Sequence, residues 1–117
     1  MQSVLTPRLS LVIPVYGNEG SIPDLLDSIR WLSTQMEGSF EAVFVVDGSP
    51  DQSYARLRAL LPDSGIRAQL LTLTRNFGAF AAIRCGLVHA RGATIAVMAA
   101  DLQEPIELII KFEATIA

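Results

Sequence analysis

The chain has 117 residues; half are hydrophobic, 18% are charged, and the formal net charge at pH 7 is −3. This length and composition indicate one folded domain or part of one and exclude a disordered chain. The acidic balance gives no electrostatic basis for binding nucleic acid, and a single cysteine excludes both an internal disulfide and a cysteine-based metal site. The sequence has no signal-peptide pattern and no apolar run near the roughly 18 residues of a membrane span, which predicts a cytoplasmic location for the chain as given.

The first elements alternate between strand and helix. Residues 9–15 form an apolar run that predicts a first strand. Apolar residues then recur at helical spacing over 22–36, which predicts an amphipathic helix. Residues 40–46 predict a second strand, apolar on both faces in its second half.

A second helix is predicted from a start signal after the second strand. Ser49 and Gln52 have the spacing of a capping box, and Pro50 suits the first helical position. The expected inward-facing side chains of this helix are Tyr54, Leu57, Leu60 and Leu61.

The second half of the chain continues the alternation. Residues 67–73 and 94–98 predict the third and fourth strands, with a helix over 79–90 between them. Pro105 then begins a helix that runs to the last residue without a stop signal, so we expect the chain to be cut there.

Strands that alternate with helices predict right-handed βαβ units and a parallel sheet. We therefore expect a Rossmann-like, three-layer α/β/α fold with strand order 3-2-1-4. Residues 1–8 would be a tail and residues 9–117 the folded part. An unpaired sheet edge favours a homodimer.

Polar residues follow three of the predicted strands. Because the carboxyl ends of parallel strands meet at one edge, Asp47 and Asp101 are expected to flank a ligand-binding crevice beside the first strand. Asp101 and Gln103, two residues apart, could hold a hard divalent cation there. The alternative is that Asp101 only caps the helix that follows.

The missing motifs narrow the kind of nucleotide site. The chain has no G-x-G-x-x-G dinucleotide fingerprint, no P-loop and no G-x-S-x-G nucleophile elbow. A metal-assisted nucleotide site without a glycine-rich phosphate loop remains, which is the arrangement of nucleotide-sugar transferases.

Four motifs, in order and at matching spacing, resemble one known family. They are residues 11–16 (LVIPVY), 45–51 (VVDGSPD), 74–78 (TRNFG) and 101–105 (DLQEP). The sequence resembles the inverting family-2 glycosyltransferases of the GT-A fold, in the branch of dolichyl-phosphate mannose synthase and bacterial polyprenyl-phosphate sugar transferases. The resemblance covers residues 9 to 113.

The resemblance implies a set of nucleotide-binding side chains: Pro14, Tyr16, Glu19, Asp47, Arg75 and Asp101. In this family, the first two of these would line the base pocket and Glu19 would lie near the nucleoside. Asp47 would accept a hydrogen bond from the base. Arg75, with Asn76, would serve the phosphate side, although Asn76 also suits an ordinary helix cap.

The resemblance also implies a metal. Asp101 and Gln103 would hold Mg²⁺ or Mn²⁺, which would bridge the diphosphate. The sequence departs from the family at Val46 and at Ala99, where the family has aspartates. These departures leave open a non-catalytic nucleotide-binding module or a degenerate relative.

For the full-length protein the resemblance implies an enzyme of cell-envelope glycan synthesis. It would transfer a sugar from a nucleotide-diphosphate sugar to an acceptor, expected to be polyprenyl phosphate, at the cytoplasmic face of the membrane. A lipid phosphate or a saccharide remains open as the acceptor. The catalytic base would lie beyond residue 117, so the 117 residues alone are expected to bind donor without transferring sugar.

Overall fold

A computed structural model describes residues 6–101 of the chain. Its strands and α-helices are β1 (Leu9–Val15), α1 (Ile22–Gln35), β2 (Phe40–Val46), α2 (Ser53–Leu60), β3 (Ala68–Thr72), α3 (Ala79–His89) and β4 (Thr94–Val97). Two short 3₁₀ turns, η2 (Glu19–Ser21) and η3 (Leu61–Asp63), precede α1 and follow α2. The helix predicted from Pro105 lies outside the described residues.

The four strands form one parallel sheet with the order β3-β2-β1-β4, which confirms the predicted topology. β1 lies inside the sheet, and its Leu11 is in register with Ala42 of β2 and with Ala96 of β4. All four carboxyl ends therefore point to the same edge, and β1 and β4 are neighbours there.

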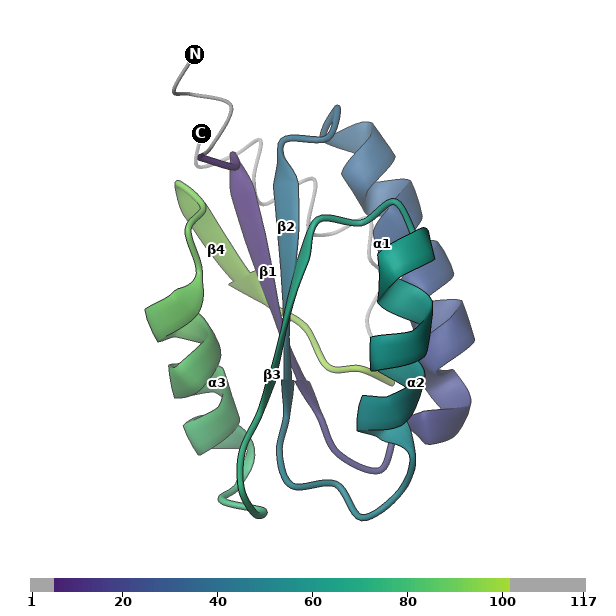
Figure 1. Cartoon of the computed structure of the whole chain (residues 1–117). Helices are drawn as coiled ribbons and strands as arrows, with labels where there is room; N and C mark the ends of the chain where they lie inside the picture. Colours follow the sequence, from purple (N-terminus) through teal and green to yellow (C-terminus); the bar gives the residue numbers. More distant parts are fainter. Residues whose placement is uncertain (1–5, 102–117) are drawn as a thin grey trace.

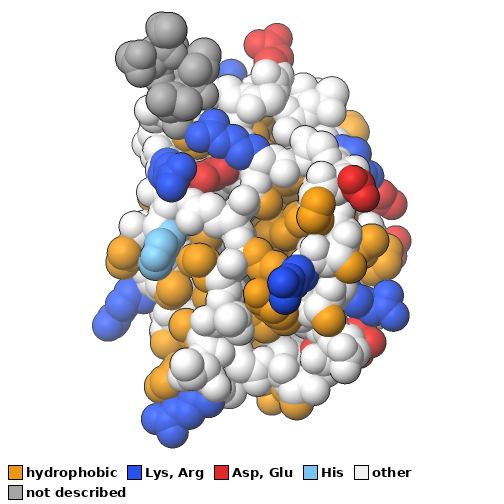
Figure 2. Space-filling model, viewed as in Figure 1, with side chains coloured by type: hydrophobic (Ala, Val, Ile, Leu, Met, Phe, Trp, Pro, Cys, Tyr) orange, Lys and Arg blue, Asp and Glu red, His pale blue; other side chains and the backbone are white. Residues whose placement is uncertain are grey.

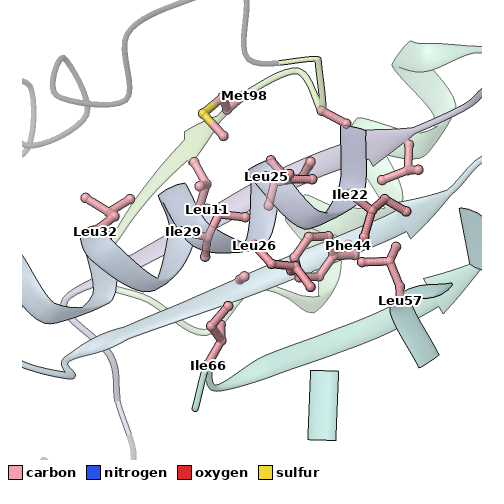
Figure 3. Packing of buried hydrophobic residues seen from close by; sticks show 14 of the residues in the cluster. Leu11, Ile22, Leu25, Leu26, Ile29, Leu32, Phe44, Leu57, Ile66 and Met98 are labelled. Atoms are coloured by element: carbon pink, nitrogen blue, oxygen red, sulfur yellow. The ribbon is translucent and has the colours of Figure 1, made fainter. Parts of the chain in front are cut away.

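The sheet is covered on both faces, as the three-layer prediction requires. Helices α1 and α2 lie on one face and α3 lies on the other (Figure 1). The helical-spacing residues of α1 are all buried and belong to one cluster that also contains Phe44 of β2 and Leu57 of α2 (Figure 3). The buried α1 residues are Ile22, Leu25, Leu26, Ile29 and Leu32.

The core on the α3 side of the sheet is smaller, and its packing depends on small residues. Ala82 of α3 is buried with Val12, Val43 and Val45 of the sheet. A Cβ added at Gly86 would overlap the side chain of Val12, so this glycine lets α3 approach the sheet closely.

The edge strand β3 is only partly buried along its length. Apolar side chains consequently reach the surface over β3 and α2 (Figure 2). Within residues 6–101, none of the helices is both long and apolar enough to cross a membrane.

The start of α2 differs from the prediction. The helix begins at Ser53, and the Ser53 N–H donates to Oδ1 of Asp51 at 3.0 Å. Ser49 does not cap the helix, because its hydroxyl donates to Asp51 and accepts the Gly17 N–H. Pro50 therefore precedes the helix, and Asp51 accepts the N–H of its first residue, Ser53.

The inward face of α2 is also narrower than predicted. Its buried residues are Ser53 and Leu57, one helical turn apart. Leu60 lies beside this line and is 41% exposed, so its predicted inward orientation is wrong. Tyr54 and Leu61 are partly buried against the core.

A buried carboxylate holds the opposite edge of the sheet together. Glu41 of β2 is 2% exposed and accepts hydrogen bonds from the Ser10 hydroxyl at 2.6 Å, the Arg91 N–H at 2.6 Å and Gln69 Nε2 at 3.2 Å. The Gly92 N–H donates to the same Ser10 hydroxyl. Burial raises the pKa of Glu41, but these hydrogen bonds outweigh it and the pKa is lowered.

Candidate nucleotide site

A cavity of about 520 Å³ lies at the carboxyl edge of the sheet. The segments that follow all four strands contribute to it. Its lining residues are Pro14, Val15, Tyr16, Asn18, Asp47, Asn76, Gly78, Ala79, Ala99, Ala100 and Asp101.

The structure brings four of the sequence-predicted residues into the lining of this cavity. Pro14 lies near the end of β1 and Tyr16 directly follows that strand. Asp47 comes directly after β2, and Asp101 follows β4. Tyr16 is 51% exposed, so a flat ring is available to a ligand there. The two carboxylates predicted to share one crevice therefore line one cavity, at the edge where open α/β sheets bind ligands.

Two other predicted residues, Glu19 and Arg75, do not line this cavity, and a third, Gln103, is not among the described residues. Glu19 faces the α2 start instead. Arg75 stacks on Phe77, with its guanidinium carbon 4.7 Å from the ring centroid. The predicted roles of these three residues stay predictions.

Asp47 is 3% exposed, and the segment after β3 supplies its hydrogen-bond donors. The Phe77 N–H donates to Oδ1 at 2.8 Å, and the Gly78 N–H donates to Oδ2 at 3.1 Å. Asn76 Nδ2 donates both to Oδ2 at 3.1 Å and to the Asp47 carbonyl oxygen at 3.2 Å. A carboxylate only accepts hydrogen bonds, so it suits a site with three converging donors.

The residue after Asp47 allows this close approach. Gly48 has φ +61°, and an added Cβ would overlap the backbone of Arg75 and Asn76. Only glycine satisfies both the left-handed backbone and the contact. The 47–48 and 75–78 segments are therefore fitted to each other.

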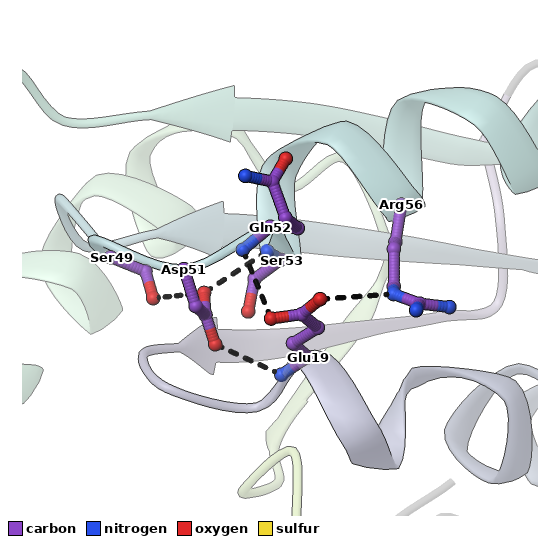
Figure 4. Close-up of polar contacts among 6 residues, drawn as sticks. All are labelled: Glu19, Ser49, Asp51, Gln52, Ser53 and Arg56. Atoms are coloured by element: carbon purple, nitrogen blue, oxygen red, sulfur yellow. Dashed lines mark hydrogen bonds and ion pairs between the residues drawn. The ribbon is translucent and has the colours of Figure 1, made fainter.

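A second carboxylate joins the loops after β1 and β2 (Figure 4). Asp51 accepts hydrogen bonds from the Ser49 hydroxyl at 2.6 Å and from the Glu19 N–H at 3.2 Å. Glu19 in turn accepts the Gln52 N–H and lies 3.5 Å from Nε of Arg56. The two loops that border the cavity on this side are thus tied together by side chains from both.

Asp51 should make the fold sensitive to acid. Burial raises its pKa, but the Ser49, Ser53 and Glu19 hydrogen bonds outweigh this and lower it from 3.8 to about 2. The unfolded chain therefore binds a proton first as the pH falls, and the stability that Asp51 contributes is lost from about pH 4 downward. We expect the melting temperature of Asp51→Asn to depend less on pH over this range, by thermal denaturation.

Asp24→Asn makes the same chemical change at an exposed position in the first turn of α1 and serves as the control. An acid slope that is equal in Asp51→Asn and in the unsubstituted chain would contradict the assignment.

The two positions that depart from the family pattern have different surroundings. Val46 is 1% exposed and belongs to the main core, outside the cavity. Ala99 lines the cavity, where its methyl group offers no oxygen ligand. The change at 99 therefore bears directly on the site, whereas the change at 46 adds apolar contact to the core.

The donor groups of the cavity suit a cation that is coordinated mainly by the phosphates of a bound nucleotide. Within residues 6–101, no group of three His, Cys, Asp or Glu side chains could enclose a metal ion. Asp101 is a lining residue with a carboxylate, and the Asp47 carboxylate already takes three donors. Mg²⁺ and similar ions commonly bind through one or two carboxylates plus substrate phosphates, so such an ion suits this donor set.

The sequence is similar to curated bacterial transferases. It is 40% identical over 101 residues to an undecaprenyl-phosphate 4-deoxy-4-formamido-L-arabinose transferase of Pseudomonas aeruginosa (strain LESB58), covering 86% of this chain and 30% of that protein. A transferase with the same name from Sodalis glossinidius (strain morsitans) is 36% identical over 102 residues, covering 87% and 31%. The chain thus spans less than a third of the length of these relatives.

Solved structures with low sequence identity share the fold. The mannosyltransferase PcManGT from Pyrobaculum calidifontis, in complex with GDP-Man and Mn²⁺, matches with a TM-score of 0.73 at 22% identity, covering 86% of this chain and 33% of that one. TarS residues 1–349 from S. aureus, in complex with UDP, match with a TM-score of 0.71 at 23% identity, covering 92% and 32%. The model of the family described as "Glycosyl transferase family 2" matches residues 10–116, and the chain therefore belongs to glycosyl transferase family 2.

Proposed function

We propose that this chain is the donor-binding part of a glycosyltransferase that transfers a sugar from a nucleotide-diphosphate sugar to polyprenyl phosphate. The observation that carries the proposal is the single cavity lined by Asp47, Asp101 and the exposed ring of Tyr16. Relatives at 40% identity are named for transfer involving undecaprenyl phosphate, which supports a lipid phosphate as acceptor.

In this proposal, each wall of the cavity serves one part of the donor. Of the lining residues, Pro14 and Tyr16 contact the base and Asp47 supports the nucleoside side. Glu19 and Arg75 lie outside the lining and would approach the nucleoside and the phosphates, respectively, from beside it. Asp101, with Gln103, would hold Mg²⁺ or Mn²⁺ against the diphosphate. When bound, the cation offsets the negative charge that grows on the leaving nucleoside diphosphate.

In this proposal, the acceptor site and the catalytic base lie outside these 117 residues, which span less than a third of the relatives' length. The 117 residues would accordingly bind nucleotide weakly and transfer no sugar. The full-length protein would work at the cytoplasmic face of the membrane, where a polyprenyl phosphate is accessible. Within residues 6–101, β3 and β4 are the edge strands of the sheet, and such edges favour a homodimer of the isolated chain.

Calorimetric titration of the chain with UDP and GDP, with and without Mn²⁺, tests the donor site. We expect binding that requires the cation, and we expect Asp101→Ala to weaken it about tenfold or more because a carboxylate facing the cation is lost. Asp24→Ala removes an exposed carboxylate from α1 and should leave binding unchanged. Binding that ignores both Mn²⁺ and Asp101 would overturn the proposal.

A second candidate is a nucleotide-binding module that has lost catalysis. Ala99 favours it, because this cavity-lining residue supplies no oxygen where the family has an aspartate. Sugar transfer to polyprenyl phosphate by the full-length protein would exclude this candidate. Nucleotide binding without any transfer would favour it.

A further inference from the structure

We propose that Asp47 is a positioning residue: it locks residues 75–78 as a preformed wall of the cavity and fixes the amide of Asn76, so that the carbonyl oxygen of this amide is the group offered to the ligand. The proposal rests on the proposed function and deepens it. It gives Asp47 a positioning role that is separate from any direct hydrogen bond between Asp47 and the base.

The first step of the argument is the direction of the hydrogen bonds. Three donors from the 76–78 segment end on the Asp47 carboxylate, and a fourth contact ends on its carbonyl oxygen. Both of the Asp47 groups involved can only accept. An asparagine at position 47 would turn an N–H₂ group toward at least one of these donors, so it could not replace the carboxylate.

The second step concerns the orientation of Asn76. Its two partners, Oδ2 and the backbone carbonyl oxygen of Asp47, are both acceptors, so the Asn76 N–H₂ must face them. Asn76 also lines the cavity. The polar atom that remains to it for a ligand is Oδ1, an acceptor, which suits an N–H group of a nucleobase.

The third step is steric and independent of charge. Gly48 packs closely against the same segment, because its missing side chain leaves room for the backbone of Arg75 and Asn76. Any Cβ at position 48 must push this backbone away. The wall is thus held by hydrogen bonds from one residue and by close contact with the next.

The consequence is a wall that is ordered before a ligand binds. A preformed site avoids the ordering cost that a mobile loop would have on binding. Nucleotide affinity should therefore depend on Asp47 and Gly48 through the order of residues 75–78.

Amide hydrogen exchange of the ligand-free chain tests the lock directly. In Asp47→Asn we expect the Phe77 and Gly78 amides to exchange about tenfold faster or more, because their acceptors are weakened. Gly48→Ala should give the same result by a steric route. Asp24→Asn, with the same chemical change on α1, should leave both amides unchanged.

Unchanged exchange at Phe77 and Gly78 in a folded Asp47→Asn chain would overturn the proposal. If Gly48→Ala fails to fold, Asp47→Asn decides the outcome, because it keeps the backbone contact at position 48.

A double-mutant cycle with UDP and GDP as probes tests the link to binding. Asp47→Asn and Asn76→Ala should each weaken binding about tenfold, and the double variant should be no weaker than Asp47→Asn alone, because both changes disable one acceptor. Additive losses would mean that Asp47 acts on the ligand separately, which would overturn the proposal. If the unsubstituted chain binds neither probe, the proposed function and the ligand role of Asn76 both fail, while the exchange experiment still judges the lock.

Discussion

Phe44→Ala should lower the free energy of unfolding by about 3–5 kcal/mol, the range for removing a large buried aromatic ring. Phe44 is fully buried in β2, beneath Leu26 of α1 and Leu57 of α2 (Figure 3). Its ring fills the space between the sheet and both helices, and these elements cannot close the gap without shifting. Urea denaturation followed by circular dichroism measures the loss.

The chain provides a matched control for this substitution. Phe80 lies on α3 and is 89% exposed, so Phe80→Ala should change the free energy of unfolding by less than about 0.5 kcal/mol. Equal losses in the two variants would mean that the core is centred elsewhere than β2.

Glu41→Ala should have the second largest effect, a loss of about 3 kcal/mol or more. Removing the carboxylate leaves the buried Ser10 hydroxyl and the part-buried Arg91 N–H without this acceptor, and a buried donor without a partner is costly. It also removes one of the hydrogen bonds, from the Arg91 N–H, that hold the turn between α3 and β4 to the sheet. Glu41→Gln should lose less, because one acceptor oxygen remains.

The pH dependence separates this network from ordinary packing. The pKa of Glu41 is lower in the folded state than in the unfolded state, so the carboxylate stabilises the fold at neutral pH. This contribution is lost as the pH falls through the lowered pKa. The difference between Glu41→Gln and the unsubstituted chain should therefore shrink in acid, measured by urea denaturation at both pH values.

Glu37→Gln is the control for charge, since Glu37 is exposed at the end of α1. A difference that is the same in acid as at neutral pH would assign the effect of Glu41→Gln to shape alone.

The topology could be predicted because local patterns encode it. Apolar runs marked the strands, helical spacing marked α1, and the alternation of strand and helix predicted a parallel sheet. The edge at which Asp47 and Asp101 meet followed from that topology alone. These inferences needed no knowledge of which side chains touch.

The contacts that hold the site could not be predicted in the same way. The donors to Asp47 lie about 30 residues further along the chain, and the Arg91 N–H that reaches Glu41 lies 50 residues from it. No local pattern specifies such pairs. The predicted start of α2 was wrong for a related reason: the Ser49 hydroxyl accepts a hydrogen bond from the Gly17 N–H of a distant loop.

One signal for the Glu41 network was present in the sequence. Residues 40–46 are apolar except for Glu41. A charge on a strand covered on both faces must find hydrogen-bond partners or carry a large desolvation cost. A lone acid in such a run therefore predicts a buried polar network, although not the identity of its members.

The central position of β1 also determines when the cavity can form during translation. Of the four strands, β1 is synthesised first, but it pairs on one side with β4, the last of them, with Leu9 opposite Thr94. The β1-α1-β2 unit can form early, whereas the last wall must wait until Asp101 has emerged. Pairing of strands that are far apart in the sequence is slow. The edge of β1 that later pairs with β4 therefore stays unpaired during synthesis, when chaperones can protect it from aggregation.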